Sequence, residues 1–113
     1  MSCLFCRIIA GEIPASTVYE DADLLAFNDT NPQAPMHVLI VPKKHVATLN
    51  DLVVADDRVI GAMVRRAAAI AQEKGYDAAG YRTVFNTNAQ AGQSVFHVHV
   101  HVLGGRPMAW PPG

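Results

Sequence analysis

The longest periodic pattern in the chain lies between Asp56 and Gly75. Apolar residues recur there three, four and seven positions apart, which is the spacing of an amphipathic helix with one buried face. The apolar positions are Val59, Ile60, Met63, Val64, Ala67, Ile70 and Ala71. The pair Asp56-Asp57 is a typical helix start and Gly75 a typical stop. The pattern therefore predicts one long helix near the middle of the chain.

Shorter apolar runs on both sides of this helix predict further elements. Residues 3–10 are suited to one or two helical turns, which Gly11 and Pro14 end. The runs that predict strands are Thr17–Glu20, Leu24–Asn28, Val38–Val41, Tyr81–Asn86 and Phe96–Leu103. Hairpin-like connections dominate this order. We therefore expect a single α+β domain over residues 1–113, with an antiparallel five-stranded sheet and one long helix.

Composition and charge narrow the class of protein. The chain has 113 residues, half of them hydrophobic, and a formal net charge of −1. Such a chain can bury a core without disulfides, and its charge gives no support to general binding of nucleic acid or membrane surfaces. The sequence begins without a typical leader, and no apolar run approaches the roughly 18 residues of a bilayer span. We expect a cytoplasmic protein with no nucleic-acid or membrane partner.

Three histidines alternate with valines in the last predicted strand. Because successive side chains of a strand point to opposite faces, His97, His99 and His101 should share one face and the valines the other. Three imidazoles on one face can ligate a metal, attack a phosphorus atom or donate hydrogen bonds to phosphate oxygens. Imidazole titrates near neutral pH, so it serves as nucleophile, acid or base in ordinary conditions.

The loop before this strand favours the phosphate interpretation. Gly92 lets the backbone approach a ligand closely, and the Ser94 hydroxyl and exposed N–H groups can cradle phosphate oxygens. Asn86, at the end of the preceding strand, supplies another donor. Taken alone, Gly92-Gln93-Ser94 would be an ordinary turn. Its position next to the histidines indicates an anion site.

Both cysteines lie near the N-terminus, as Cys3-Leu-Phe-Cys6. In a reducing compartment this spacing suggests metal binding or redox chemistry rather than a structural bridge. The pair supplies only half of a structural zinc site, which normally takes four ligands. From the spacing alone, half a zinc site, a redox dithiol and two reduced cysteines all stay open.

Several segments together resemble the histidine-triad (HIT) family, in which His-x-His-x-His is followed by two apolar residues. The matching segments are Phe5–Pro14, Asn31–Pro35, Ile40–His45, Gly92–Leu103 and Gly104–Gly113. The Trp-Pro-Pro-Gly ending resembles the purine nucleoside phosphoramidase branch of the family. The resemblance implies a HIT-like fold, a homodimer and a purine nucleotide substrate. It also implies hydrolysis of the P–N bond of adenosine 5′-phosphoramidates through a covalent nucleotidyl-histidine, with no metal required for catalysis.

The resemblance also implies a role for each catalytic residue. His99 is the nucleophile, and the backbone carbonyl of His97 orients its other ring nitrogen. His101 contacts phosphate oxygens, and His37 lies behind the nucleophile and handles its proton. Ser94 assists the leaving amine. The implied nucleotide-binding residues are Phe27, Asp29, Thr30, Asn86, Gly92, Gln93, Ser94, Val95, His99 and His101.

For two groups the resemblance adds to what the residues indicate. Asp29 taken alone would be a turn aspartate, whereas the family pattern makes it the ligand of the ribose hydroxyls. The cysteine pair is completed by His45 and His97, so that the expected metal ligands are Cys3, Cys6, His45 and His97. Zinc with four protein ligands has no open position, so its role would be structural.

The nucleoside pocket departs from the better-known animal members, and this leaves the base preference open. Asn28 stands where they often have histidine, Thr30 where isoleucine is usual, and Met36 where a smaller residue precedes His37. Two other functions are considered. The C-terminal tail argues against a dinucleoside polyphosphate hydrolase. The intact set of His99, His101 and Ser94 argues against a nucleotide-binding interaction protein with vestigial catalysis.

Overall fold

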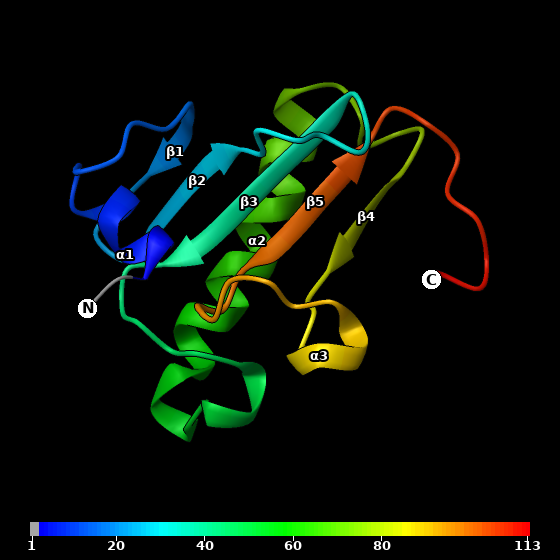
Figure 1. Cartoon of the computed structure of the whole chain (residues 1–113). Helices are drawn as coiled ribbons and strands as arrows, with labels where there is room; N and C mark the ends of the chain where they lie inside the picture. Colours follow the sequence, from blue (N-terminus) through cyan, green and yellow to red (C-terminus); the bar gives the residue numbers. More distant parts are fainter. Residues whose placement is uncertain (1–2) are drawn as a thin grey trace.

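Five strands form one antiparallel sheet whose spatial order differs from the chain order. In the computed structural model, which describes residues 3–113, the order is β1-β2-β3-β5-β4 (Figure 1). The strands are β1 (Thr17–Glu20), β2 (Leu24–Asn28), β3 (Met36–Pro42), β4 (Tyr81–Val84) and β5 (Val100–Gly104). All neighbouring strands pair antiparallel. The last strand thus lies inside the sheet, directly beside β3, and the predicted α+β architecture is confirmed.

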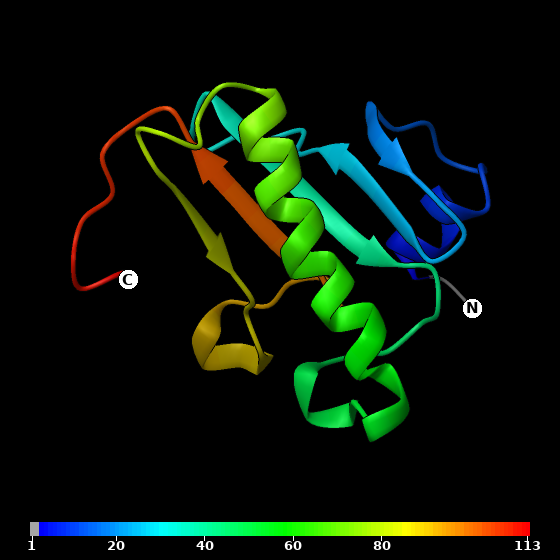
Figure 2. The ribbon, with the colours of Figure 1, turned by 180° about the vertical axis from the view of Figure 1, so that it is seen from behind.

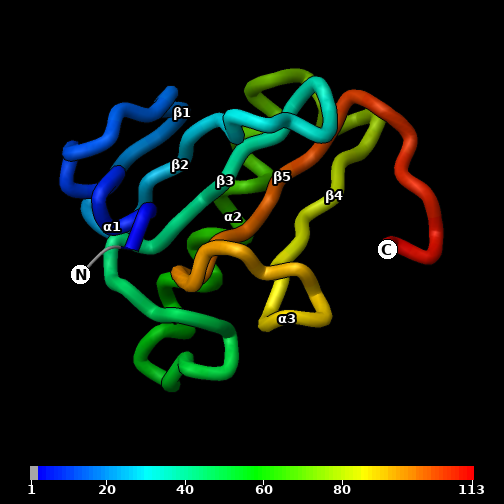
Figure 3. Tube along the Cα trace, viewed as in Figure 1, coloured from blue at the N-terminus to red at the C-terminus, as the bar shows by residue number. Residues whose placement is uncertain are grey.

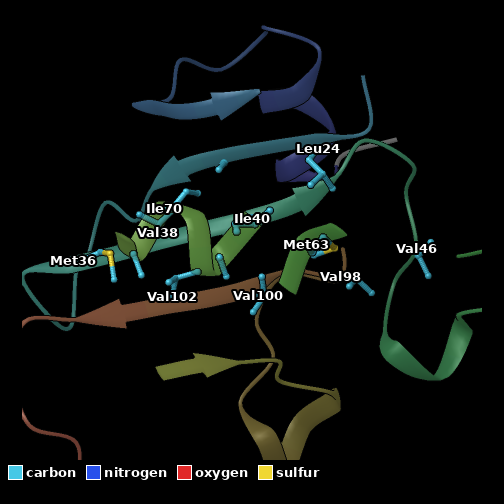
Figure 4. Close-up of a cluster of buried hydrophobic side chains, with 13 residues drawn as sticks. Leu24, Met36, Val38, Ile40, Val46, Met63, Ile70, Val98, Val100 and Val102 are labelled. Carbon is cyan, nitrogen blue, oxygen red and sulfur yellow. The ribbon is translucent and has the colours of Figure 1, made fainter. Parts of the chain in front are cut away.

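Helix α2 (Asp57–Glu73) covers one face of the sheet and closes the main core (Figure 2). Most of its predicted buried stripe meets alternate residues of the central strands, as Figure 4 shows, but the prediction was wrong for Val64, which lies on the solvent side of the helix and is 51% exposed. The fully buried members of this core include Met63, Ala67, Ile70, Val38, Ile40, Val100 and Val102. Two short 3-10 turns, η1 (Leu49–Asp51) and η2 (Val54–Asp56), precede the helix. Within residues 3–113, no helix is long and apolar enough to cross a bilayer.

The opposite face of the sheet is covered only in part, by the short helix α1 (Leu4–Ile9). Phe5 of this helix is buried against Leu25 and Phe27 of β2 and Leu39 and Val41 of β3. Figures 1 and 2 place α1 on the side away from α2. Because alternate residues of β3 and β5 serve the α2 core, the other half of each strand faces the α1 side, where the histidines lie.

The last strand is shorter than the predicted run Phe96–Leu103. Regular pairing begins only at Val100, because the Val98 N–H donates instead to the Val46 carbonyl at 2.7 Å. The alternation of faces nevertheless holds through the irregular part, since Val98 joins the α2 core. The predicted strand boundary was wrong, and the predicted facing of the valines is confirmed.

The segment between the last two strands is also more structured than expected. Strand β4 ends at Val84 rather than Asn86, and the predicted loop of residues 88–94 contains a single helical turn, α3 (Asn88–Ala91). Gly92 ends this turn with a φ of 84°, a left-handed conformation that favours glycine. The chain then returns directly toward β5.

Truncation of a core residue of α2 tests the packing of this helix on the sheet. Met63→Ala should lower the free energy of unfolding by about 2–5 kcal/mol, because the fully buried side chain leaves a cavity. The exposed Arg65 of the same helix provides the control, and Arg65→Ala should stay within about 0.5 kcal/mol of wild type. Urea unfolding measures both values, and equal stabilities for the two variants would contradict the assigned helix face.

Candidate active site

Strands β3 and β5 bring two of the five histidines together on the face away from α2. Leu39 pairs with His101 and His37 with Leu103, so these four side chains project from the same face. The His99 ring lies beside them, its centroid 5.0 Å from that of His101. The predicted common face is therefore formed, although only His101 of the three alternating histidines lies within the regular strand β5.

The proton position on His99 follows from one short hydrogen bond. Its Nδ1 lies 2.7 Å from the His97 carbonyl oxygen, and because a carbonyl only accepts, Nδ1 carries the proton. Nε2 is left with a free lone pair. The Phe5 ring packs edge-on against the imidazole with centroids 5.0 Å apart, and burial lowers the pKa of His99. The result is a neutral, fixed imidazole whose Nε2 can attack an electrophilic atom.

A second chain of hydrogen bonds fixes the proton of His101. The backbone N–H of Gln33 donates to Nδ1 of His37 at 3.0 Å, so the His37 proton is on Nε2. That N–H donates to Nδ1 of His101 at 2.9 Å, which leaves the His101 proton on Nε2. His101 is therefore a neutral donor. His37, expected behind the nucleophile, makes its hydrogen bond to His101, and its role toward the proton of His99 stays a prediction.

Burial explains why both members of this pair are neutral. It lowers the pKa of His37, and the Asp29 carboxylate only partly opposes this effect. Burial, together with the neighbouring imidazoles of His99 and His37, lowers the pKa of His101 to about 4. At neutral pH the site thus offers oriented N–H donors rather than imidazolium cations.

Beside these histidines lies a cavity of about 450 Å³. Its walls come from α1 and from the segment of residues 13–16, together with the end of β2 and the loop before β5. The predicted residues that line it are Phe27, Asp29, Thr30, Ser94, Val95, His99 and His101. A volume of this order suits a small organic ligand, and its walls are largely apolar.

Asp29 serves the turn and also faces the site. Its Oδ1 accepts the N–H of Asn31 at 2.9 Å, as a turn aspartate would. Its Oδ2 lies 3.4 Å from Nε2 of His37, and the residue borders the cavity. One carboxylate oxygen is therefore on the side of the histidines; the turn role of Asp29 is confirmed, and its ribose-binding role stays a prediction.

Three predicted ligand residues, Asn86, Gly92 and Gln93, are not among the cavity-lining residues of the described chain. For Gln93 the reason is clear, because its buried amide is used by the backbone. Its Oε1 accepts the N–H of Asn88, and its Nε2 donates to the carbonyls of Ala47 and Val95. The side chain of Gln93 therefore holds the loop that carries Ser94, and a contact of this residue with the nucleotide stays a prediction.

Several cavity residues were missed from the sequence. Leu4, Phe5 and Ile8 of α1 form one wall, and Leu39 of β3 contributes to another. The apolar run of residues 3–10 did carry a signal, because a short apolar segment must cover some surface. The identity of that surface depends on how α1 docks against β2 and β3, which the local pattern does not contain.

The four predicted metal ligands converge in one cluster. All donor atoms of Cys3, Cys6, His45 and His97 lie within 4.8 Å of one another. Nε2 of the buried His97 donates to the Pro42 carbonyl at 2.8 Å, so its Nδ1 lone pair faces the cluster. This second contact is typical of a metal-bound histidine.

Three of the four following separations fit tetrahedral zinc, and the separation between His45 and His97 is slightly shorter. His97 Nδ1 lies 3.5 and 3.6 Å from the two sulfurs and 3.1 Å from Nδ1 of His45, and Cys6 Sγ lies 3.3 Å from Nδ1 of His45. Tetrahedral zinc with bonds of about 2.0–2.3 Å separates its ligand atoms by roughly 3.3–3.8 Å. The residues present are therefore compatible with zinc in both number and donor type.

Asp29, His37 and His101 also place their donor atoms within 4.8 Å of one another. The hydrogen bond outside this group has the opposite direction to that of His97: Nδ1 of His37 accepts the Gln33 N–H, and Nε2 keeps its proton. A metal-bound histidine normally donates its outer N–H. The hydrogen bonds of this group therefore favour a chain of N–H donors over a metal site. We call the chain from the Gln33 N–H through His37 to His101 the histidine relay.

The fold is that of a small α+β protein, a five-stranded sheet backed by one helix. Its site combines oriented histidines with an apolar cavity, an arrangement suited to catalysis on a small ligand. The model of the HIT domain matches residues 10–108, and the chain belongs to the HIT family. A purine nucleoside phosphoramidase of Escherichia coli K12 is 45% identical over 93% of this chain and 88% of that protein.

Solved structures agree with this assignment. A HIT family hydrolase from Legionella pneumophila Philadelphia 1 is 54% identical, with a TM-score of 0.97 over 99% of this chain and 100% of that chain. A zinc-bound histidine triad family protein from Mycobacterium smegmatis is 36% identical, with a TM-score of 0.81 over 94% of this chain and 76% of that chain. The predicted family and fold are confirmed.

The buried histidines predict a dependence of stability on pH. The pKa of His101 falls from 6.5 in its usual state to about 4 in the folded chain, so the unfolded chain binds more protons between these values. The free energy of unfolding should therefore be largest above pH 6.5 and should fall as the pH is lowered toward 4. His101→Asn should reduce this slope, as measured by urea unfolding at pH 7 and pH 5. An unchanged slope would contradict the assigned burial of His101.

Proposed function

We propose that this HIT family hydrolase cleaves the P–N bond of adenosine 5′-phosphoramidates and releases a nucleoside monophosphate and an amine. The observation that carries the proposal is the His99 imidazole, which is neutral, fixed by the His97 carbonyl and beside a nucleoside-sized cavity. The name of the Escherichia coli relative supports the same reaction.

The reaction proceeds in two steps. The Nε2 lone pair of His99 forms a bond to the α-phosphorus while the P–N bond breaks, and the leaving amine takes a proton from solvent through the Ser94 hydroxyl, which is itself reprotonated by that water. The positive charge that develops on the ring is stabilised through Nδ1–H by the His97 carbonyl. Water then bonds to phosphorus while the bond from phosphorus to His99 Nε2 breaks; the proton lost by this water returns to solvent, which balances the proton taken up in the first step, and the nucleoside monophosphate is released with His99 restored. Covalent catalysis thus replaces one difficult displacement by two easier ones.

Binding is divided between the two ends of the cavity. His101 Nε2–H and the Ser94 hydroxyl donate to the phosphate oxygens, where the negative charge is concentrated. Asp29 accepts from the ribose hydroxyls, and Phe27 and Thr30 form part of the purine pocket. Asn86 and Gly92 stay predicted contacts of the approach to the phosphate.

We also propose that Cys3, Cys6, His45 and His97 hold a structural zinc ion. The donor set is complete, and the zinc-bound Mycobacterium smegmatis relative supports this assignment. Zinc would fix the N-terminal segment, and with it the α1 wall of the cavity, to the residue whose carbonyl orients His99. No bond-breaking step depends on the ion.

We further propose that the protein is a homodimer, as the family resemblance implies. Exposed apolar side chains support a further contact surface: Val64 on α2 is 51% exposed and Trp110 in the tail 83% exposed. The proposal concerns assembly alone and leaves the chemistry of His99 unaffected.

The assignment of the nucleophile is tested with His99→Ala. Hydrolysis of adenosine 5′-monophosphoramidate should fall by about 10³-fold or more, since a covalent route loses its nucleophile. Acid quenching of wild type with radiolabelled substrate should trap labelled protein, and His99→Ala should give none. Arg65→Ala, on the exposed side of α2, should keep full activity. Full hydrolysis by His99→Ala would refute the assignment, and faster wild-type cleavage of diadenosine triphosphate would favour a polyphosphate hydrolase.

The zinc assignment is tested by metal analysis of the purified protein. Wild type should contain one zinc ion per chain, and Cys3→Ser and Cys6→Ser should each lose most of it, because a thiolate ligand is removed. His101→Asn is the matched control and should keep its zinc, since His101 belongs to the relay. Wild-type protein purified without chelators and free of zinc would rule out the proposed site.

A further inference from the structure

The C-terminal tail leaves β5 beside the loop between β2 and β3 (Figure 3). At Gly105 φ is 98°, and an added Cβ would lie 2.8 Å from Cβ of Pro35 and 3.0 Å from Cε1 of Tyr76. Only glycine fits this conformation and this approach. The tail is therefore held directly against the loop that precedes His37.

Arg106, the next residue, binds that loop. Its Nε donates to the Gln33 carbonyl at 2.8 Å, and its Nη1 donates to the Pro107 carbonyl at 3.1 Å. The side chain of Gln33 donates in turn to the Asn31 carbonyl at 3.0 Å. Gln33 is the residue whose backbone N–H donates to His37, so Arg106 fixes the group at which the histidine relay begins.

The direction of this relay is set at its first donor. With the Gln33 N–H on Nδ1 of His37, each later proton has one position, and His101 presents Nε2–H at the cavity. Without that donor, His37 can carry its proton on Nδ1 and accept from Nδ1–H of His101. His101 would then present a lone pair, which repels phosphate oxygens.

Asp29 also favours the proton on Nε2 of His37, through its Oδ2 at 3.4 Å. In the proposed complex this carboxylate accepts from the ribose hydroxyls, so its contribution to the relay is shared with substrate. The Gln33 N–H is not shared, because it belongs to the backbone of the loop. The position of that loop therefore controls the relay when substrate is bound.

We propose that Arg106 is a positioning residue: by holding the Gln33 carbonyl it keeps the Gln33 N–H on His37 and so maintains the Nε2–H tautomer of His101. The consequence for catalysis rests on the proposed function, whereas the tautomer is a property of the free protein. Arg106 touches neither substrate nor the reacting atoms and acts through three successive hydrogen bonds.

The Arg106 side chain is exposed, so its substitution should leave the folded state intact. A positioning role can therefore be separated from a purely structural one by comparing variants of equal stability. Arg106→Met removes the donors and keeps much of the apolar stem, and Arg106→Lys keeps the charge and one donor group. Arg58→Met is the matched control, since Arg58 is also exposed and also hydrogen-bonded, to Asp23. All three variants should melt at the wild-type temperature within the error of the measurement.

The direct test is nitrogen-15 NMR of the imidazole rings in the ligand-free full chain at pH 7. Wild type and Arg58→Met should show His101 with its proton on Nε2 alone. Arg106→Met should show a mixture of both tautomers, and Arg106→Lys should restore most of the Nε2–H form. A single Nε2–H tautomer in Arg106→Met, or an Nδ1–H tautomer in wild type, would overturn the proposal whatever the activity.

Kinetics with adenosine 5′-monophosphoramidate give the second readout. Removing a transition-state donor outright costs about 10²–10³-fold in kcat, so loss of its positioning in Arg106→Met should lower kcat roughly 5-fold with little change in KM. Arg106→Lys should recover most of this loss. Unchanged kcat despite mixed tautomers would overturn the catalytic part of the proposal. Absence of phosphoramidate cleavage by wild type would overturn the proposed function and leave the tautomer result standing.

Discussion

The hydrogen bond from His99 Nδ1 to the His97 carbonyl is the contact on which the site depends. It decides which nitrogen of His99 has a lone pair, and it holds the ring in one orientation. His97 is itself fixed, because its Nε2 donates to the Pro42 carbonyl and its Nδ1 faces the cysteine cluster. One buried residue therefore joins the N-terminal segment to the catalytic imidazole, through its ring on one side and its backbone on the other.

The same face of the sheet holds two histidine groups. They differ in what the ring nitrogen that points away from the group bonds to. His97 donates its outer N–H to a carbonyl, which directs its lone pair at Cys3 and Cys6. His37 accepts a backbone N–H at its outer nitrogen and so directs an N–H at His101. The side chains are chemically identical, and the backbone group that each meets makes one suited to a metal and the other to a relay.

Placement of this chemistry depends on a sheet with two unequal faces. Helix α2 packs across the central strands on one face, so Val98, Val100 and Val102 are buried there, and the alternate residues are available on the other side. Helix α1 covers only part of that second face. The remaining space is the cavity, which is why its walls include α1 while its polar groups come from β5, the β2–β3 loop and the loop before β5.

The sequence by itself determined what depends on local periodicity and donor type. It placed most of the buried stripe of α2, the opposite faces of the valines and histidines, and the cluster of Cys3, Cys6, His45 and His97, the last two through the family pattern. The tertiary structure alone decided that β5 lies between β3 and β4, that His37 meets His101, that the Gln93 amide turns inward and that Arg106 reaches Gln33. The last three of these contacts join residues 46 to 73 positions apart. They follow from strand register and loop path, which no short stretch of sequence encodes.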